Sequence, residues 1–274
     1  MAATQRRPNA SAGKGRKKRR NKRRVVRPLR VQWWWVAASF AAAALLYLVA
    51  VRPAVSKSEG HVIVPEGTYA FGIDISHNNK GPIVWDSLCI CIDSRGRTVR
   101  SLQEARRIEP VSFVFIKASE GVSMKDPDFM KNWESALSAG IPRGAYHFYR
   151  TSRDPARQAG NFISAAGAIR FKDLPPVLDI ETTHRGLTKE KLNSDLLIWL
   201  ETVGKHYGRK PVIYTSDSFA RDWLSPTLKA EYPLWIAHYR KEPPYTKGWT
   251  WWQFTDRGTV YGAPEPVDIS VRIK

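Results

Sequence analysis

The sequence contains only two cysteines, Cys89 and Cys91, among 274 residues. This excludes a small domain held together by disulfides and a zinc cluster built on cysteines. Its six histidines never occur in the HxH or HExxH spacing of common metal sites. The composition, with 43% hydrophobic and 25% charged residues, is otherwise that of a globular protein. The chain is long enough for one large domain or two small ones.

Acidic residues are completely missing from the first 30 residues, which hold 13 Lys and Arg. Most of the net charge of +19 therefore belongs to this tail, and the remaining chain carries only +6. The tail has no hydrophobic period and its like charges repel, so residues 1–30 are predicted to be disordered. Such basic runs often bind nucleic acid, but they also flank membrane spans, so the residues that follow the tail are needed to interpret it.

Residues 31–51 contain no charged residue. A helix of this length spans about 30 Å, the thickness of the hydrocarbon core of a bilayer. Trp33, Trp34 and Trp35 lie at one end, where an aromatic belt is expected. The basic tail predicts a cytoplasmic N-terminus, with everything after the span outside. The tail is then expected to contact anionic lipid, and no nucleic acid partner is expected.

Two alternatives to a membrane span are a buried core helix and a cleaved signal peptide. A domain of this size needs no core helix so long and uncharged. A signal peptide normally has an apolar stretch of 7–15 residues, and the candidate cleavage site near Ala54 follows Arg52 and Pro53. We therefore expect an uncleaved transmembrane signal-anchor helix, with residues 52–69 as a linker to an exported domain at 70–274.

Short apolar runs typical of strands recur through this exported domain and alternate with helix signals. The runs occupy residues 71–76, 113–118, 144–149, 176–181, 211–216, 234–239, 249–254 and 267–271. Helices are predicted at 127–139, at 154–168 with Asp154 as N-cap, at 188–207, and briefly after Ser216. The alternation predicts an α/β fold, a TIM-like β/α barrel with five β-α units and three terminal strands.

The connection at residues 77–111 is unusually long for such a barrel. Its segment 88–102 is predicted to form a surface hairpin that turns at residues 94–96. Cys89 and Cys91 lie two residues apart in one strand of this hairpin, a spacing that rarely meets disulfide geometry. We interpret both as packing residues.

Four acids lie within or at the ends of otherwise apolar strands: Asp74, Asp179, Glu181 and Asp268. Acids in such positions are unfavourable to bury without partners, which indicates a site. Asp179 and Glu181 are two residues apart, so they point to the same side of a strand. In a partly desolvated pocket the pKa of one member of the pair rises, and a protonated acid beside an ionised one is what glycosidic cleavage requires.

Other polar and aromatic side chains accompany these acids near the strand ends. Aromatic rings suit the apolar faces of sugars, although in barrel strands they are usually packing residues. The candidates are Lys117, Tyr146, Tyr214, Trp235, Tyr239, Trp252 and Gln253, with Trp85 nearby in the sequence. A metal site from Asp74, Asp179, Glu181 and His147 is conceivable, but no ligand spacing supports it, so neither a metal nor a cofactor is expected.

Eight ordered motifs in residues 69–274 resemble glycoside hydrolase family 25, the Chalaropsis-type lysozymes. They include GIDIS (72–76), FVFIKASEG (113–121), GAYHFYR (144–150), PVLDIE (176–181), PVIYTS (211–216), LWIAHY (234–239), WWQFTDRGTVYG (251–262) and VDIS (267–270). The resemblance implies a barrel of five β-α units and three strands. It also implies an N-acetylmuramidase that cleaves β-1,4 bonds between N-acetylmuramic acid and N-acetylglucosamine in peptidoglycan.

The resemblance further implies roles for single residues. Glu181 matches the general acid, and Asp179 matches the carboxylate that orients and stabilises the 2-acetamido group of the substrate. Asp74 and Asp268 match flanking acids, and Tyr146, Tyr214 and Trp252 match sugar contacts. The long 77–111 connection and the membrane anchor depart from the family pattern, which leaves the shape of the groove open.

The expected protein is thus a lysozyme anchored in a bacterial inner membrane, with its catalytic domain in the periplasm or facing the wall. Peptidoglycan glycan strands are its expected partner. The alternative from a different class is a peptidoglycan-binding module on the same barrel that has lost catalysis. The presence of all four acids gives no sign of such a loss.

Overall fold

The computed structural model describes residues 62–264 and 266–274 of the chain. The predicted tail at 1–30, the predicted transmembrane helix at 31–51 and most of the predicted linker lie outside these residues. Within the described ranges, no helix is both long enough and apolar enough to cross a bilayer.

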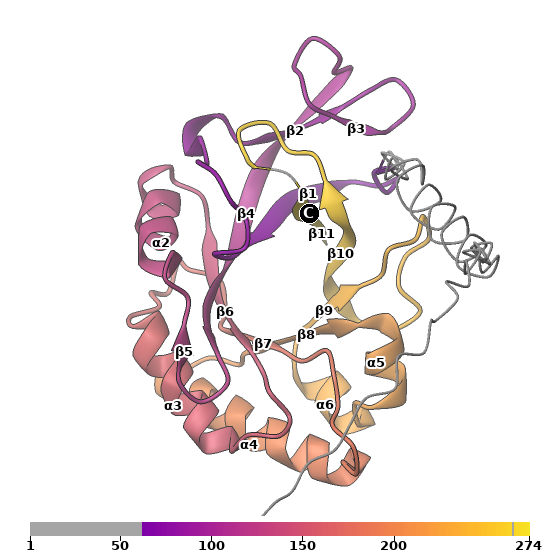
Figure 1. Ribbon diagram of the computed structural model, residues 1–274. Coiled ribbons are helices and arrows are strands. Elements are labelled where there is room, and N and C mark those ends of the chain that lie inside the picture. Colours follow the sequence, from indigo (N-terminus) through magenta and orange to yellow (C-terminus); the bar gives the residue numbers. More distant parts are fainter. Residues whose placement is uncertain (1–61, 265) are drawn as a thin grey trace, which may run out of the picture. The chain divides into compact units, whose positions relative to one another are not determined.

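Eight strands form a closed barrel, seen along its axis in Figure 1. In chain order they are β1 (Tyr69–Ile75), β4 (Arg107–Glu120), β6 (Arg143–Phe148), β7 (Val177–Asp179), β8 (Val212–Ser216), β9 (Leu234–Ala237), β10 (Trp249–Gly258) and β11 (Val267–Ile273). Seven of them are parallel, and β11 pairs antiparallel with both β10 and β1. The parallel pairing of β1 with β4 closes the ring.

Helices cover the outside of the barrel between β4 and β9 (Figure 1). They are α2 (Phe129–Ser138), α3 (Pro155–Ala166), α4 (Lys189–Tyr207), α5 (Asp217–Asp222) and α6 (Pro226–Glu231). The predicted N-cap is confirmed, because the Asp154 side chain accepts a hydrogen bond from the Arg157 amide. The eight-stranded β/α barrel is confirmed, but the fifth β-α unit is not: the connection from β1 to β4 carries no α-helix, only the 3-10 turn η1 (Trp85–Ser87).

The place of that missing helix is taken by the predicted hairpin, β2 (Cys89–Ile92) and β3 (Thr98–Val99). The first residues of β4 extend beyond the barrel and pair with β2. Cys89 and Cys91 are free thiols with sulfur atoms 4.0 Å apart. At the other end of β4, the short strand β5 (Met124–Lys125) turns back and pairs with it.

The predicted linker ends earlier than residue 69. The Val62 carbonyl accepts a hydrogen bond from the Thr98 amide, the Val64 amide donates to the Gly96 carbonyl, and Val64 is buried. Backbone pairing with the hairpin therefore makes residues 62–68 part of the folded domain. Hydrophobic periodicity in the sequence identifies only the barrel strand that starts at Tyr69.

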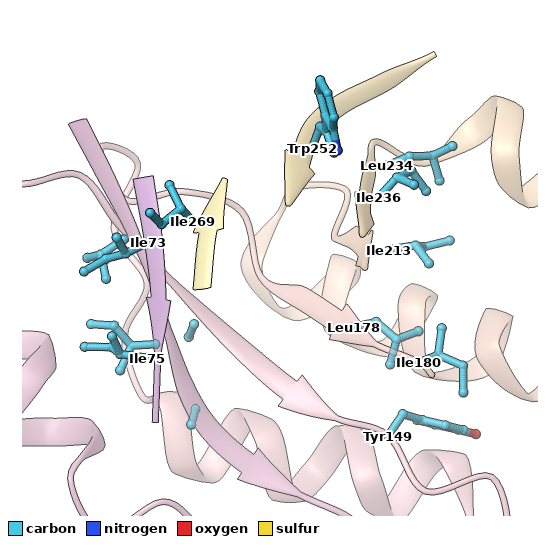
Figure 2. Packing of buried hydrophobic residues seen from close by; sticks show 14 of the residues in the cluster. Ile73, Ile75, Tyr149, Leu178, Ile180, Ile213, Leu234, Ile236, Trp252 and Ile269 are labelled. Carbon is cyan, nitrogen blue, oxygen red and sulfur yellow. The ribbon is translucent and has the colours of Figure 1, made fainter. Parts of the chain in front are cut away.

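Successive side chains along each barrel strand point to opposite faces, so the apolar residues form two layers. One layer faces outward under the helices and includes Ile73, Ile180, Ile236 and Trp252, several of which are drawn in Figure 2. The other fills the barrel interior and is mainly aromatic: Phe113, Phe115, Val177, Val212, Tyr214, Trp235, Ala237 and Trp251. In this interior layer the rings of Phe115 and Trp235 stack with centroids 4.4 Å apart.

Two glycines make room for this interior layer. A Cβ atom on Gly72 would lie 2.2 Å from the Phe113 ring, and one on Gly144 would lie 2.6 Å from the Phe115 ring. The aromatic layer closes the half of the barrel near the amino ends of the parallel strands. The half near their carboxyl ends is left for polar side chains.

Candidate active site

A cavity of about 500 Å³ opens at the carboxyl ends of the parallel strands. Its walls contain most of the predicted site residues on the barrel strands, together with Glu181 just beyond β7. The lining residues are Asp74, Ser76, Asn78, Asn79, Lys80, Lys117, Tyr146, Phe148, Asp179, Glu181, Tyr214, Trp235, Asp256, Pro266 and Asp268. A cavity of this size fits a sugar-sized ligand, and its position agrees with the place of chemistry in β/α barrels.

Asp179 and Glu181 lie on the same wall of the cavity, as their spacing predicts. Asp179 is the last residue of β7 and is 5% exposed, and Glu181 lies at the open mouth. Burial raises the pKa of Asp179 well above its usual value, and the neighbouring Glu181 carboxylate raises it further. Burial of its carboxyl group also raises the pKa of Glu181, against a lowering by its hydrogen bond with Asp179 and by Lys117. The pair therefore retains a proton at higher pH than isolated carboxyls do.

A second acidic pair, Asp74 and Asp268, lies on neighbouring strands in direct register. Burial and the charge of Asp268 raise the pKa of Asp74 well above its usual value. Burial raises the pKa of Asp268 to about 6. Two carboxyls this close cannot both ionise easily, so this pair also holds a proton near neutral pH.

The side-chain amide of Gln253 connects the second acidic pair to two tyrosines. Its Oε1 accepts hydrogen bonds from the Tyr214 hydroxyl at 2.8 Å and the Tyr239 hydroxyl at 2.7 Å. Its Nε2 donates to Asp74 at 2.9 Å and to Asp268 at 3.4 Å. Because both hydroxyls occupy the oxygen, the amide nitrogen must face the carboxyls. Gln253 thus lies behind the cavity wall and supports the acids.

Lys117 brings one positive charge into the acidic cavity. The ammonium group of Lys117, which is 6% exposed as a residue, lies 2.7 Å from Glu120 Oε2, and Arg150 binds the other oxygen of the same carboxylate. Burial alone would raise the pKa of Glu120, but the hydrogen bonds and charges of Lys117 and Arg150 lower it below its usual value. Glu120 therefore stays ionised and holds Lys117 beside the Asp179–Glu181 pair.

Trp252 does not line the cavity. It is fully buried in the outward-facing layer, near Leu234 and Ile236 in Figure 2, and its Nε1 donates to the His238 carbonyl at 2.7 Å. Adjacent residues of a strand face opposite sides, so Gln253 pointing inward forces Trp252 outward. Trp252 is therefore a packing residue, which corrects its prediction as a sugar contact.

Three other aromatic or imidazole candidates also lie away from the cavity walls. Tyr239 is half exposed, and its hydroxyl hydrogen bonds Gln253 behind the cavity wall. Trp85 packs against the outward-facing layer. His147 faces outward from β6, where it hydrogen bonds Ser119 and stacks on Trp199. Burial lowers the pKa of His147 to about 4, so it is neutral at ordinary pH.

Sequence reasoning missed several cavity residues. Lys80 and Asn79 come from the loop after β1, and Phe148 comes from β6. Asp256 lies in β10 beyond a shift of register between Gln253 and Thr255. This irregularity breaks the alternation of sides, so strand periodicity could not have identified Asp256. For Phe148, the alternation from Tyr146 was a usable signal.

No metal site emerges from the described part of the chain, where no group of three or more His, Cys, Asp and Glu is arranged to hold an ion. The metal set considered from the sequence fails because His147 lies on the other side of the sheet from the acids. The cavity walls in the described part of the chain carry carboxyls, the ammonium groups of Lys80 and Lys117, neutral polar side chains and aromatic rings.

An acidic cavity at the carboxyl ends of a β/α barrel is typical of barrel glycoside hydrolases. Comparison with known proteins supports this class. Residues 73–263 match the model of glycosyl hydrolases family 25. The chain belongs to this family.

The relatives show how far the similarity extends. An uncharacterized protein, YegX of Escherichia coli K12, is 38% identical over 163 residues, covering 59% of each chain. Lysozyme M1 of Streptomyces globisporus is 32% identical over 214 residues, covering 72% of this chain and 65% of the relative. The crystal structure of the lysozyme from Streptomyces coelicolor aligns with a TM-score of 0.61 at 31% identity, over 75% of this chain and 92% of that one. The chain thus spans less than two thirds of the length of YegX and of Lysozyme M1.

Proposed function

We propose that this protein is a muramidase that hydrolyses the β-1,4 bond between N-acetylmuramic acid and N-acetylglucosamine in peptidoglycan. The observation that carries the proposal is the pair Asp179 and Glu181 on one wall of a cavity, with both pKa values raised by burial. Relatives whose names include lysozyme and muramidase support the substrate class.

In this mechanism the proton that the Asp179–Glu181 pair retains passes through Glu181, at the mouth, to the glycosidic oxygen as the bond from that oxygen to the anomeric carbon breaks. This transfer leaves Asp179 ionised. Asp179, deeper in the wall, orients the 2-acetamido group of the substrate. When the oxygen of that acetamido group attacks the anomeric carbon, Asp179 stabilises the positive charge that develops. Water then adds to the anomeric carbon as the bond between that carbon and the acetamido oxygen breaks, and the water gives one proton to the Glu181 carboxylate. One water is consumed, and the leaving sugar takes the proton that Glu181 gave up.

The remaining cavity residues bind and orient. Asp74 and Asp268, held by Gln253, complete the acidic wall opposite the pair, and Tyr146, Tyr214 and Trp235 offer hydroxyls and ring surface to the sugars. Lys117 limits how far the pKa of Asp179 and Glu181 rises, because its charge favours their ionised forms.

The proposal includes the location of the enzyme. We propose that residues 31–51 anchor the chain in a bacterial inner membrane by a single span, with the basic tail in the cytoplasm and the barrel outside. The uncharged apolar run, the three tryptophans and the charge asymmetry of its flanks support this orientation.

The test compares the full chain with Glu181→Gln and Asp179→Asn on purified peptidoglycan. Glu181→Gln is expected to lower the rate of release of new reducing ends by at least about 10²-fold, because a general acid usually accelerates a reaction by that factor or more. The thermal unfolding temperature should stay unchanged. Mass spectrometry of the products must show N-acetylmuramic acid at the new reducing ends. Reducing ends on N-acetylglucosamine, or wild-type rates for Glu181→Gln, would contradict the assignment. Binding without cleavage by the wild type would indicate a non-catalytic wall-binding module.

A further inference from the structure

The amino-end rim of the barrel, opposite the cavity, displays two matching tripeptides. Residues 170–172 read Arg-Phe-Lys and residues 272–274 read Arg-Ile-Lys. The central apolar side chains are unusually open to solvent: Phe171 is 98% exposed and Ile273 is 61% exposed. All four flanking basic residues are exposed as well. Each tripeptide therefore presents an apolar tip between two positive charges.

Both tripeptides lie at the same end of the molecule. Residues 170–172 belong to the loop that leads into the amino end of β7, and Ile273 pairs with Tyr69, the first residue of β1. The loop into β8 adds Arg209 and Lys210 to this end. Two exposed acids lie in the short segments that meet this rim: Glu231, the last residue of α6, and Glu66, three residues before Tyr69. The six Lys and Arg residues at 170, 172, 209, 210, 272 and 274 outnumber them. The rim is thus strongly basic, whereas the opposite end of the barrel holds the acidic cavity.

The turn that carries Phe171 is held firmly by Asp173, which is buried. Asp173 Oδ2 accepts a hydrogen bond from the Arg170 amide at 2.7 Å, and its Oδ1 accepts one from Arg143 Nε at 3.0 Å. The Asp173 carbonyl accepts another from Arg209 at 2.8 Å. Phe171 is therefore presented to solvent by a fixed turn.

The chain enters the domain on the side of this rim. Residue 62 pairs with the hairpin and leads to Tyr69, which neighbours Ile273. The predicted span ends at residue 51, and the eleven residues from there to Val62 reach at most about 40 Å. Part of the domain must then stay close to the lipid surface, and the rim is the part that combines apolar tips with positive charge.

We infer that the amino-end rim, through residues 170–172 and 272–274, lies against an anionic lipid surface and points the cavity away from the bilayer. The inference rests on the membrane anchoring in the proposed function. Basic side chains are attracted to anionic headgroups, and a neighbouring apolar side chain enters the boundary between headgroups and acyl chains. This contact would orient the enzyme toward the wall polymer rather than leave it free to rotate on its tether.

The test uses the full chain reconstituted into vesicles of phosphatidylcholine alone or mixed with phosphatidylglycerol. Flotation of the vesicles reports anchoring, and amide hydrogen exchange reports the rim. In anionic vesicles, exchange at segments 168–174 and 270–274 is expected to be slower than in neutral vesicles by about tenfold or more. The variant Arg170→Glu, Phe171→Ser, Lys172→Glu is expected to lose this difference at 168–174. All three side chains are exposed, so the fold should be kept.

The matched control reverses two exposed charges at the opposite end, Arg157→Glu and Lys189→Glu, in the first turns of α3 and α4. It should keep the lipid-dependent slowing. Equal exchange at the rim in both vesicles, with the chain floating in both, would overturn the rim contact and leave the anchor intact. Flotation with neither vesicle would overturn both. Slowing that requires added glycan fragments instead of anionic lipid would assign the rim to the wall and reject the inference. Release of reducing ends from soluble glycan tests hydrolysis separately.

Discussion

The Nε2 atom of Gln253 lies 2.9 Å from Asp74 Oδ2, so a neutral amide supports a buried carboxylate pair across strands β10, β11 and β1. The amide has no freedom to turn, because its oxygen is held by two tyrosine hydroxyls. A residue behind the cavity wall thereby determines where hydrogen-bond donors meet the acids.

Replacing Gln253 by Leu removes the donors that favour ionised Asp74. The pKa of the Asp74–Asp268 pair is then expected to rise by about one unit, since one hydrogen bond to a charged group contributes about 1.5–3 kcal/mol. The pH dependence of kcat/KM should move to higher pH on its acidic side. Tyr239→Phe is the matched control: it removes one donor to Gln253 while Tyr214 still fixes the amide, so its shift should be much smaller. An unchanged profile for Gln253→Leu would contradict this role.

Asp268→Asn is expected to stabilise the protein in a pH-dependent way. The pKa of Asp268 is raised to about 6 in the folded state, above the value of about 3.9 in an unfolded chain. The folded protein therefore binds the proton more tightly, and this contribution is fully present below about pH 4 and lost as the pH rises to about 6. Asn cannot ionise, so at pH 7 the free energy of unfolding should increase by about 3 kcal/mol, with little change at pH 3.5. Thermal unfolding at the two pH values measures this difference, and equal destabilisation at both would refute it.

Trp252→Phe and Trp235→Phe should separate packing from binding. Trp252 is buried in the outward-facing layer and donates to the His238 carbonyl, so its replacement should lower the free energy of unfolding by about 1–3 kcal/mol. The KM of the Trp252→Phe variant for peptidoglycan fragments should stay unchanged. Trp235 lines the cavity, and its replacement should raise KM. A raised KM for Trp252→Phe would restore it as a sugar contact.

Glu120→Gln and Arg150→Met should shift the pH profile in opposite directions. Without the Glu120 carboxylate, the charge of Lys117 acts on Asp179 and Glu181 without compensation, which lowers their pKa values. The alkaline limb of activity should then move to lower pH. Removing Arg150 takes away a charge that lowers the pKa of Glu181, so the alkaline limb should move to higher pH. Rates measured across pH with soluble glycan fragments check both signs, and a shift of the same sign in the two variants would refute the network.

Side chains two residues apart in a strand point to the same face, and this rule explains which parts of the site could be predicted from the sequence. Asp179 ends the short buried strand β7 and Glu181 follows two residues later on the same side. The same rule places Asp74, Tyr146, Tyr214 and Trp235 on the inner side. The rule also shows why Trp252 and Gln253 could not both be sugar contacts. Position near a strand end and the family resemblance both favour Trp252 as a sugar contact, whereas the alternation turns it outward, and the structure supports the alternation.

Other parts of the structure depend on contacts between distant segments. The register shift in β10 that brings Asp256 to the cavity arises from its pairing with β11. The pairing of residues 62–64 with the hairpin depends on segments more than 30 residues apart. The support that Gln253 gives to Asp74 joins residues 179 positions apart. Hydrophobic periods within one segment carry no information on such pairings.

The aromatic layer formed by Phe113, Phe115, Trp235 and Trp251 gives the barrel a closed floor. The barrel interior is therefore not a channel, and a substrate of the proposed hydrolase can reach Asp179 and Glu181 only from the open end of the cavity. Under the proposed function, the substrate therefore enters the cavity and leaves it by the same opening at the carboxyl ends of the strands.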